Sequence, residues 1–186
     1  LSATTVKNPS TSSSVYKLSP GILMSENHFY PLTIKHVKPE TDNAICVSFD
    51  IPESLTDTFA FKQGQFLTLS TKIDGEEVRR SYSICSGVDD GSLRVGIKRV
   101  VGGVFSIHAN DYFKPGVVVN ILPPQGSFFT ELNADNQKRY MCLAVGSGIM
   151  PVLSLTKSIL SREPGSFVTI LYANRQTSQI VFKEEL

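Results

Sequence analysis

The chain has 186 residues, of which 41% are hydrophobic and 19% charged, and its formal net charge is +1 at pH 7. This balance lacks the basic excess of nucleic-acid-binding proteins, and no apolar run reaches the length of a membrane span. We therefore expect neither nucleic acid nor a membrane as partner, in a chain long enough for one large domain or one domain plus part of another.

Residues 1–28 are predicted to form a disordered tail, because they are rich in Ser, Thr and Pro and show no hydrophobic periodicity. They lack the charged start and apolar core of a signal peptide, and the absence of arginine before Arg79 argues against a transit peptide. The chain begins with Leu1 rather than methionine and ends within residues 182–186, which are predicted to be helical. We therefore expect a piece of a longer protein.

Residues 29–130 are predicted to form an antiparallel barrel. Short β-type runs, the first with alternating apolar and polar residues, occur at residues 29–38, 44–49, 64–71, 80–86, 93–99 and 117–122. Turn signals separate several of them, at Asp74-Gly75, Asp90-Gly91, Pro115-Gly116 and Pro123-Pro124. Six short strands with one short helix, at residues 105–113, are typical of such a barrel.

The pattern changes after about residue 137. Residues 140–145 form a nearly continuous apolar run, as expected for a strand buried on both faces. Helical spacing over residues 152–160 and a second buried strand at 167–172 complete a βαβ unit. Residues 138–186 are therefore predicted to be the start of a parallel α/β domain.

The most informative motif is Arg-Ser-Tyr-Ser at residues 80–83. On an extended segment Arg80 and Tyr82 project to the same face, and Ser83 follows on the opposite side. The guanidinium suits a phosphate, the phenol ring can stack on a conjugated ring, and the hydroxyl can donate or accept a hydrogen bond. A flavin nucleotide fits this combination, and the alternative is an ordinary half-buried strand with a surface arginine.

Two glycine turns precede predicted helices, where backbone amides and the helix dipole favour phosphate. Gly102 and Gly103 lead into the first helix, in which Ser106 could cap the helix or bond a phosphate oxygen; a plain glycine turn is the alternative. The second turn, at residues 146–151, reads Gly-Ser-Gly-Ile-Met-Pro and could admit a pyrophosphate, with the proline in the first helical turn. Arg175, after the second strand, could meet a phosphate or lie on the surface.

The chain offers no metal-site spacing. His28, His36 and His108 are scattered, and Cys46, Cys85 and Cys142 are far apart. Thiols without a disulfide pattern favour a reducing, cytoplasmic setting, where Cys46 and Cys142 are expected to be small buried apolar residues.

These features, in this order, resemble the ferredoxin–NADP⁺ reductase superfamily, and most of all the reductase components of multicomponent oxygenases such as the phenylacetyl-CoA epoxidase reductase. The resemblance covers residues 30–186. It rests on Arg80-Ser81-Tyr82-Ser83, Gly103-Val104-Phe105-Ser106, Lys114-Pro115-Gly116, Pro124-Gln125-Gly126-Ser127-Phe128, Gly146-Ser147-Gly148-Ile149-Met150-Pro151, Tyr172-Ala173-Asn174-Arg175 and Phe182-x-Glu184-Glu185-Leu186.

The resemblance implies a six-stranded antiparallel barrel that holds FAD, followed by the start of a parallel α/β nucleotide-binding domain. It implies that Arg80 pairs with the flavin phosphates, that Tyr82 stacks on the isoalloxazine ring, and that Ser83 lies near N5, the atom that accepts hydride. Tyr82 and Ser83 would then be the catalytic residues. The other implied FAD contacts are Ser81, Ile97, Lys98, Gly102, Gly103, Val104 and Ser106.

The resemblance also implies NADP, or NAD, as second cofactor, bound by Gly146, Ser147, Gly148, Pro151 and Arg175. Hydride would pass from NAD(P)H to the flavin, and electrons would leave singly to an iron–sulfur protein or domain. The family's later cysteine motif and a Cys-x₄-Cys-x₂-Cys ferredoxin motif are missing from these 186 residues. Two alternatives therefore stay open: a flavin reductase of the same fold, and a non-catalytic FAD-binding module.

Overall fold

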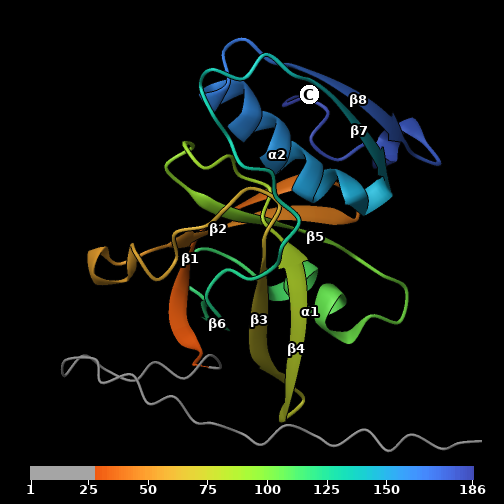
Figure 1. Cartoon of the computed structure of the whole chain (residues 1–186). Helices are drawn as coiled ribbons and strands as arrows, with labels where there is room; N and C mark the ends of the chain where they lie inside the picture. Colours follow the sequence, from red (N-terminus) through yellow and green to blue (C-terminus); the bar gives the residue numbers. More distant parts are fainter. Residues whose placement is uncertain (1–27) are drawn as a thin grey trace, which may run out of the picture.

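Six antiparallel strands form one sheet, in the order β4-β3-β6-β1-β2-β5. The computed structural model describes residues 28–186, so the tail predicted for residues 1–28 lies, apart from His28, outside the described residues. The strands are β1 Tyr30–Thr41, β2 Ala44–Asp50, β3 Phe66–Ile73, β4 Glu76–Ser83, β5 Leu93–Lys98 and β6 Val118–Ile121. This arrangement confirms the predicted six-stranded antiparallel barrel (Figure 1).

The sheet closes on itself where an isolated antiparallel bridge joins Ile84, just past β4, to Val95 of β5. Inward-facing residues alternate with outward-facing ones, so Leu32 and Ile34 of β1 are buried while their neighbours are exposed. Helix α1 (Val104–Tyr112) adds Phe105, which is fully buried in the same core. The predicted helix at residues 105–113 is thereby confirmed, displaced by one residue.

A second, smaller unit follows the barrel (Figure 1). Strands β7 (Arg139–Val145) and β8 (Phe167–Ala173) pair in parallel, and helix α2 (Ile149–Arg162) connects them. Helix α2 lies between this strand pair and the barrel (Figure 1), and Met150 belongs to a buried cluster that also contains Cys46 and Cys85 of the barrel. The predicted start of a parallel α/β domain is confirmed.

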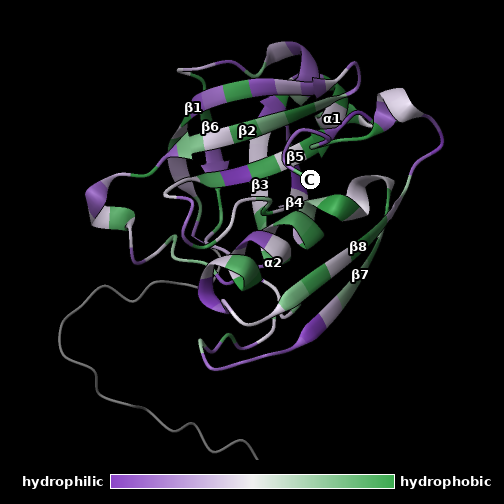
Figure 2. Cartoon of the chain, turned by 90° about the horizontal axis from the view of Figure 1, so that it is seen from above, coloured by the Kyte–Doolittle hydropathy of each residue, from purple (hydrophilic) through white to green (hydrophobic). Residues whose placement is uncertain are grey.

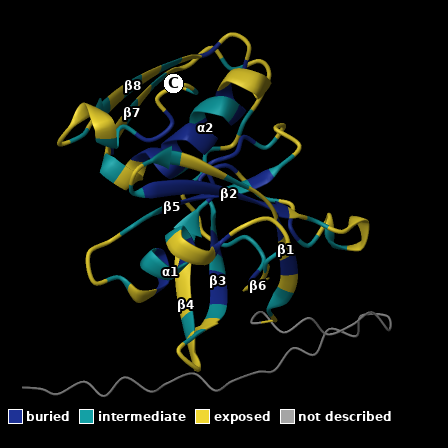
Figure 3. Ribbon diagram, turned by 180° about the vertical axis from the view of Figure 1, so that it is seen from behind, coloured by how far each residue is buried: buried dark blue, intermediate teal, exposed yellow. Residues whose placement is uncertain are grey.

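The prediction that β7 is buried on both faces is wrong. Met141, Leu143 and Val145 are 70%, 70% and 75% exposed, and β8 similarly exposes Phe167 and Leu171. Figure 2 shows hydrophobic residues along both strands, and Figure 3 shows exposed residues along them. Helix α2 covers one face of the pair, whereas nothing within residues 28–186 covers the other.

Two further local predictions differ from the structure: a predicted helix is absent at residues 182–186, and a predicted strand has other bounds. Residues 182–186 form turns rather than a helix: Phe182 is buried and has a left-handed φ of +60°, so burial of one side chain overrides the local helical preference. The strand predicted at residues 80–86 is β4, which begins at Glu76 directly after the Asp74-Gly75 turn and ends at Ser83. The chain leaves the sheet after Ile84, where it is held by α2.

Glycine at position 64 is required on two counts, its φ of +85° and the Phe128 carbonyl oxygen that would lie 1.9 Å from an added Cβ. Gly75 has a similar φ of +87° but open space around it. We expect Gly75→Ala to lower the free energy of unfolding by about 1 kcal/mol, from backbone strain alone. Gly64→Ala should cost about 1–3 kcal/mol more, because it adds overpacking. Urea unfolding followed by circular dichroism measures both, and equal losses would contradict the close approach of Phe128.

Candidate functional site

The register of β4 against β3 places Arg80 opposite Leu69 and Tyr82 opposite Leu67. Ser81 pairs with Thr68 on the other face, where the two hydroxyl oxygens are 2.9 Å apart. Cross-strand partners share a face, so Arg80 and Tyr82 lie together, with Ser81 and Ser83 opposite, as the alternation predicts.

Tyr82 is half-buried and packs on helix α1, its ring centroid 5.6 Å from that of Phe105. Burial raises the pKa of the Tyr82 phenol to about 12, against a smaller lowering by the neighbouring Arg80 guanidinium. The phenol is therefore neutral at physiological pH. Because Phe105 belongs to α1, this ring contact brings β4 beside the glycine turn that starts the helix.

Arg80 and its neighbour Arg79 have different surroundings. Arg79 forms an ion pair with Glu77 at 2.9 Å, and its guanidinium lies over the Phe29 ring. Arg80 is exposed, and its hydrogen bond within residues 28–186 is to the Arg79 carbonyl oxygen, at 2.6 Å. The Arg80 guanidinium therefore has no carboxylate partner in the described part of the chain and can meet an anionic ligand.

The N-terminus of α1 lacks a capping side chain. Gly102 has a φ of +71° with open space around it, and Gly103, in the N-cap position, leads into Val104. Ser106 does not cap the helix. Its buried hydroxyl accepts from Val100 N at 3.1 Å and donates to Gly103 O at 3.1 Å, and so stabilises the conformation of the loop at residues 100–103. Uncapped first-turn amides beside an open glycine suit a phosphate.

Two residues predicted to lie beside this turn differ in their placement. Ile97 is fully buried in the barrel core, so only its backbone could face a ligand there. Lys98 instead lines a cavity of about 320 Å³ with Val101, Gly146 and Arg175. The structure thus brings Lys98 to the second glycine turn.

This cavity, at the second glycine turn and called the second cavity below, is also lined by residues that the sequence analysis missed, namely Asn43, Val145, Ala173, Asn174 and Gln179. Both polar side-chain atoms of Asn174 are buried and have no hydrogen-bond partner within residues 28–186, so they can bond a polar group of a ligand in this cavity. The signal available in the sequence was the position of Asn174, directly before Arg175 at the end of β8.

The glycine turn at this cavity takes the conformation expected of it. Gly146 has a φ of +52°, residues Gly146–Gly148 form one 3-10 turn, and Ser147 and Gly148 are exposed. Pro151 lies in the first turn of α2, where its missing N–H is not needed. Like α1, helix α2 has no side-chain cap, but the Ile149 N–H donates to the Gly146 and Ser147 carbonyls and Pro151 has no N–H. The helix dipole, rather than a row of free amides, therefore favours an anion at this end of α2.

Within residues 28–186, no cluster of three or more His, Cys, Asp and Glu side chains is arranged to hold a metal ion. No helix in the same part of the chain combines the length and the hydropathy needed to cross a membrane. The cysteines are free thiols: Cys46 and Cys85 are buried with their Sγ atoms 3.8 Å apart, and Cys142 is half-buried.

Comparison with known proteins places this geometry in context. Residues 31–130 match the oxidoreductase FAD-binding domain family. The chain is 38% identical to a 1,2-phenylacetyl-CoA epoxidase component of Escherichia coli over 158 residues, which are 85% of this chain and 44% of that protein. It is 37% identical to the 3-ketosteroid-9-alpha-monooxygenase ferredoxin reductase component of Mycobacterium tuberculosis over 169 residues, 86% and 46% of the two chains. The chain thus spans less than half the length of these relatives.

Solved structures support the fold. A ferredoxin NADP⁺ reductase from Neisseria gonorrhoeae, with bound FAD and NADP, superposes with a TM-score of 0.70 at 24% identity, covering 87% of this chain and 63% of that one. Phthalate dioxygenase reductase gives a TM-score of 0.73 at 23% identity, covering 87% and 48%.

The raised pKa of Tyr82 has a measurable consequence. Between pH 10 and about 12 the phenol ionises in the unfolded chain before it ionises in the folded one, so its contribution to stability is present below pH 10 and lost across that window. We expect Tyr82→Phe to remove a phenol that titrates near pH 12. In an ultraviolet pH titration, the variant should therefore show less phenolate absorbance than the unchanged chain near pH 12, but the same absorbance near pH 10. Tyr112→Phe, which replaces an exposed ring, is the control. Loss of absorbance around pH 10 in Tyr82→Phe would contradict the burial of this phenol.

Proposed function

Because this chain belongs to the oxidoreductase FAD-binding domain family, with the fold of ferredoxin–NADP⁺ reductases, we propose that it is the flavin-binding part of an NAD(P)H-dependent reductase. The observation that carries the proposal is the meeting of β4 and α1. Within the described residues 28–186, it combines an arginine without a carboxylate partner, a half-buried tyrosine ring and an uncapped helix N-terminus behind two glycines. We assign residues 29–130 to an FAD-binding domain and residues 138–186 to part of a nucleotide-binding domain.

In the flavin site, Arg80 and the backbone at Gly102, Gly103 and Val104 hold the phosphates of FAD. This assignment is supported by the open, uncapped turn and by the Arg80 guanidinium, which bonds a backbone carbonyl but no carboxylate within residues 28–186. Ser106 and the Ile97 backbone contribute indirectly. Asn110 Nδ2 of α1 donates to the Ile97 carbonyl of β5 at 3.3 Å and to the Ser106 carbonyl at 2.8 Å, so the helix that follows the turn is bonded to β5.

Tyr82 provides a flat ring face for the isoalloxazine, while Ser81 and Ser83 offer hydroxyls on the other side of β4. Tyr82 and Ser83 are the proposed catalytic residues: Tyr82 positions the isoalloxazine ring, and Ser83 forms a hydrogen bond to it. When bound, FAD supplies the redox chemistry, taking up electrons in pairs and releasing them singly. The neutral phenol adds no charge beside the ring, because its pKa is about 12.

The second cavity is proposed to bind NAD(P)H. Gly146, Ser147 and Gly148 present backbone amides ahead of α2, and Pro151 keeps the first turn helical. Lys98 and Arg175 add positive charge to the lining of the cavity, so we assign Lys98 to this nucleotide rather than to FAD. Arg175, at the end of β8, favours NADP through a 2′-phosphate.

The electron acceptor is proposed to be an iron–sulfur protein or domain of an oxygenase system. Support comes from the relatives: one is named as a monooxygenase ferredoxin reductase component, and phthalate dioxygenase reductase is described as transferring electrons from pyridine nucleotides to [2Fe-2S]. We place the reaction in the cytoplasm, a reducing compartment in which the free thiols of Cys46, Cys85 and Cys142 persist.

A non-catalytic FAD-binding module is the second candidate for the chain as it stands. One observation favours it: the nucleotide-binding unit has two paired strands in the described residues, and the apolar face of that pair is exposed. Weak NAD(P)H binding would follow if the site needs further residues.

Purified chain reconstituted with FAD distinguishes the two candidates. We expect a yellow complex after gel filtration, because the glycine turn before α1, Arg80 and the ring-stacking face of Tyr82 all belong to this chain. Anaerobic addition of NADPH should bleach the visible flavin absorbance if the chain is a reductase. A yellow complex that NADPH leaves unbleached supports the binding module, and colourless protein overturns both.

The role of Arg80 can be tested against its neighbour. Arg80→Ala should weaken FAD binding by about 1.5–3 kcal/mol, roughly 10–150-fold, because a charge-assisted contact to phosphate is lost. Arg79→Ala is the matched control: it removes the same charge one residue away, where the side chain is already paired with Glu77. Fluorescence titration with FAD gives both dissociation constants. Equal weakening would show that only the local net charge matters.

A further inference from the structure

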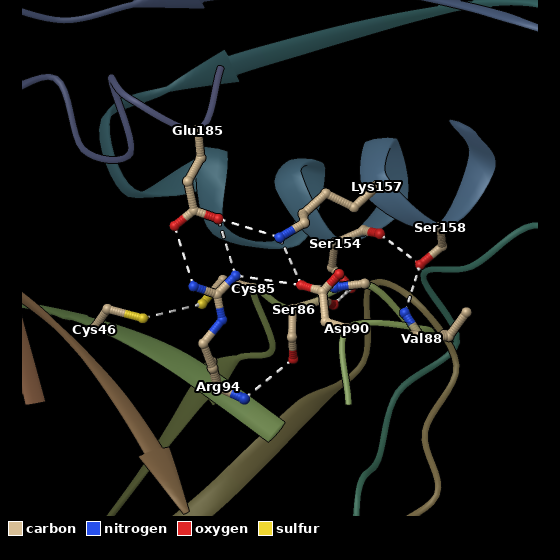
Figure 4. A network of polar contacts seen from close by, with 11 residues as sticks. Cys46, Cys85, Ser86, Val88, Asp90, Arg94, Ser154, Lys157, Ser158 and Glu185 are labelled. Atoms are coloured by element: carbon tan, nitrogen blue, oxygen red, sulfur yellow. Dashed lines mark hydrogen bonds and ion pairs between the residues drawn. The ribbon is translucent and has the colours of Figure 1, made fainter. Parts of the chain in front are cut away.

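The face of α2 that meets the barrel loop is polar. Its side chains recur at the i, i+3, i+4, i+7, i+8 spacing that places residues on one side of a helix: Ser154, Lys157, Ser158, Ser161 and Arg162. Each of them contacts residues 86–90, the segment that follows β4. Figure 4 shows part of this contact, in which α2 side chains point toward the loop.

Ser154 makes the most buried of these contacts. It is completely buried, and its hydroxyl accepts from Gly64 N at 3.3 Å and donates to the Ser86 carbonyl oxygen at 2.7 Å. Gly64 lies just before β3, and Ser86 lies just after β4. One hydroxyl of the nucleotide-binding helix therefore joins the two chain segments at the end of the β3–β4 hairpin.

That end of the hairpin is where Ser83 of the proposed flavin site lies. Ser83 pairs with Phe66, and the next residue, Ile84, donates its N–H to Gln65 O at 2.8 Å. The backbone from position 83 to position 86 is therefore tied to β3 at one end and to Ser154 at the other.

A charged cluster holds the same loop from outside. The Arg94 guanidinium binds Glu185 through two nitrogens, at 3.1 and 3.0 Å, and Lys157 Nζ lies 2.6 Å from Asp90 and 3.2 Å from Glu185 (Figure 4). The backbone of Arg94 is bonded to Cys85 N and to Ser86 Oγ. Two cations and two carboxylates thus fasten α2 and the C-terminal turns to the loop after β4.

We propose that Ser154 is a positioning residue of the flavin site, an inference that rests on the proposed function. By bonding both chain segments at the open end of the β3–β4 hairpin, it fixes the end of β4 that carries Tyr82 and Ser83 relative to the helix that starts after the Gly146–Gly148 turn. The two cofactor-binding regions are thereby kept in one relative placement. Without the hydroxyl, the Gly64 N–H and the Ser86 carbonyl would lose a buried partner, and the strand end would shift to recover one.

The test compares Ser154→Ala with Ser161→Ala in the whole chain. Ser161 is on the same helix face but bonds the exposed Asp89 side chain, farther from β4. For each variant we would measure the melting temperature without FAD, the FAD dissociation constant well below that temperature, and the visible circular dichroism of bound FAD, which reports the ring's surroundings. We expect Ser154→Ala to raise the dissociation constant about tenfold and to alter the dichroism spectrum. Ser161→Ala should leave both within about twofold.

The outcomes separate the two proposals. If Ser154→Ala lowers only the melting temperature, with the FAD constant and dichroism unchanged, the residue is merely structural and the positioning role is wrong. If Ser154→Ala fails to fold, Ser154→Cys, which keeps a weak donor and acceptor, replaces it with the same criteria. Failure of the unchanged chain to bind FAD overturns the proposed function, and the positioning role with it.

Discussion

The structure depends on a double attachment of the segment between β4 and β5. On one side this segment closes the barrel, through the Ile84–Val95 bridge and the bond from Cys85 N to Arg94 O. On the other side it is bonded to α2 through Ser154 and Ser158. Closure of the barrel and placement of α2 therefore both follow from one loop conformation. Buried hydroxyls hold this conformation, and their loss would leave backbone groups unsatisfied.

Both proposed cofactor sites use the same physical device. A glycine with positive φ, Gly102 or Gly146, is followed within three residues by a helix that no side chain caps. The helix dipole favours an anion at each turn, although at the second turn the Ile149 N–H is already bonded to the Gly146 and Ser147 carbonyls. The two turns differ in what surrounds them. The first starts the helix that packs on the Tyr82 ring, whereas the second is lined by Lys98, Arg175 and the unpartnered Asn174.

The barrel was predictable because its evidence is local. The alternating burial of strand residues, as at Leu32 and Ile34, appears in the sequence as alternating apolar and polar residues. Turns such as Asp74-Gly75 mark where one strand ends and the next begins. The shared face of Arg80 and Tyr82 on β4 was predictable for the same reason, because it follows from strand alternation alone. The exposure of one face of β7 was not predictable, because an apolar run such as 140–145 does not show whether another element packs on its second face.

The amino-acid sequence by itself thus determined the order of strands and helices, the two glycine turns and the family to which the chain belongs. Only the tertiary structure decided that Lys98 lies at the second turn, that the polar atoms of Asn174 are buried without a partner within residues 28–186, and that α2 meets the barrel with serines. The physical reason is the separation along the chain over which each interaction acts. Backbone period and turn chemistry act between near neighbours, whereas the partner of Ser154 or Arg94 lies up to 91 positions away and is chosen by packing.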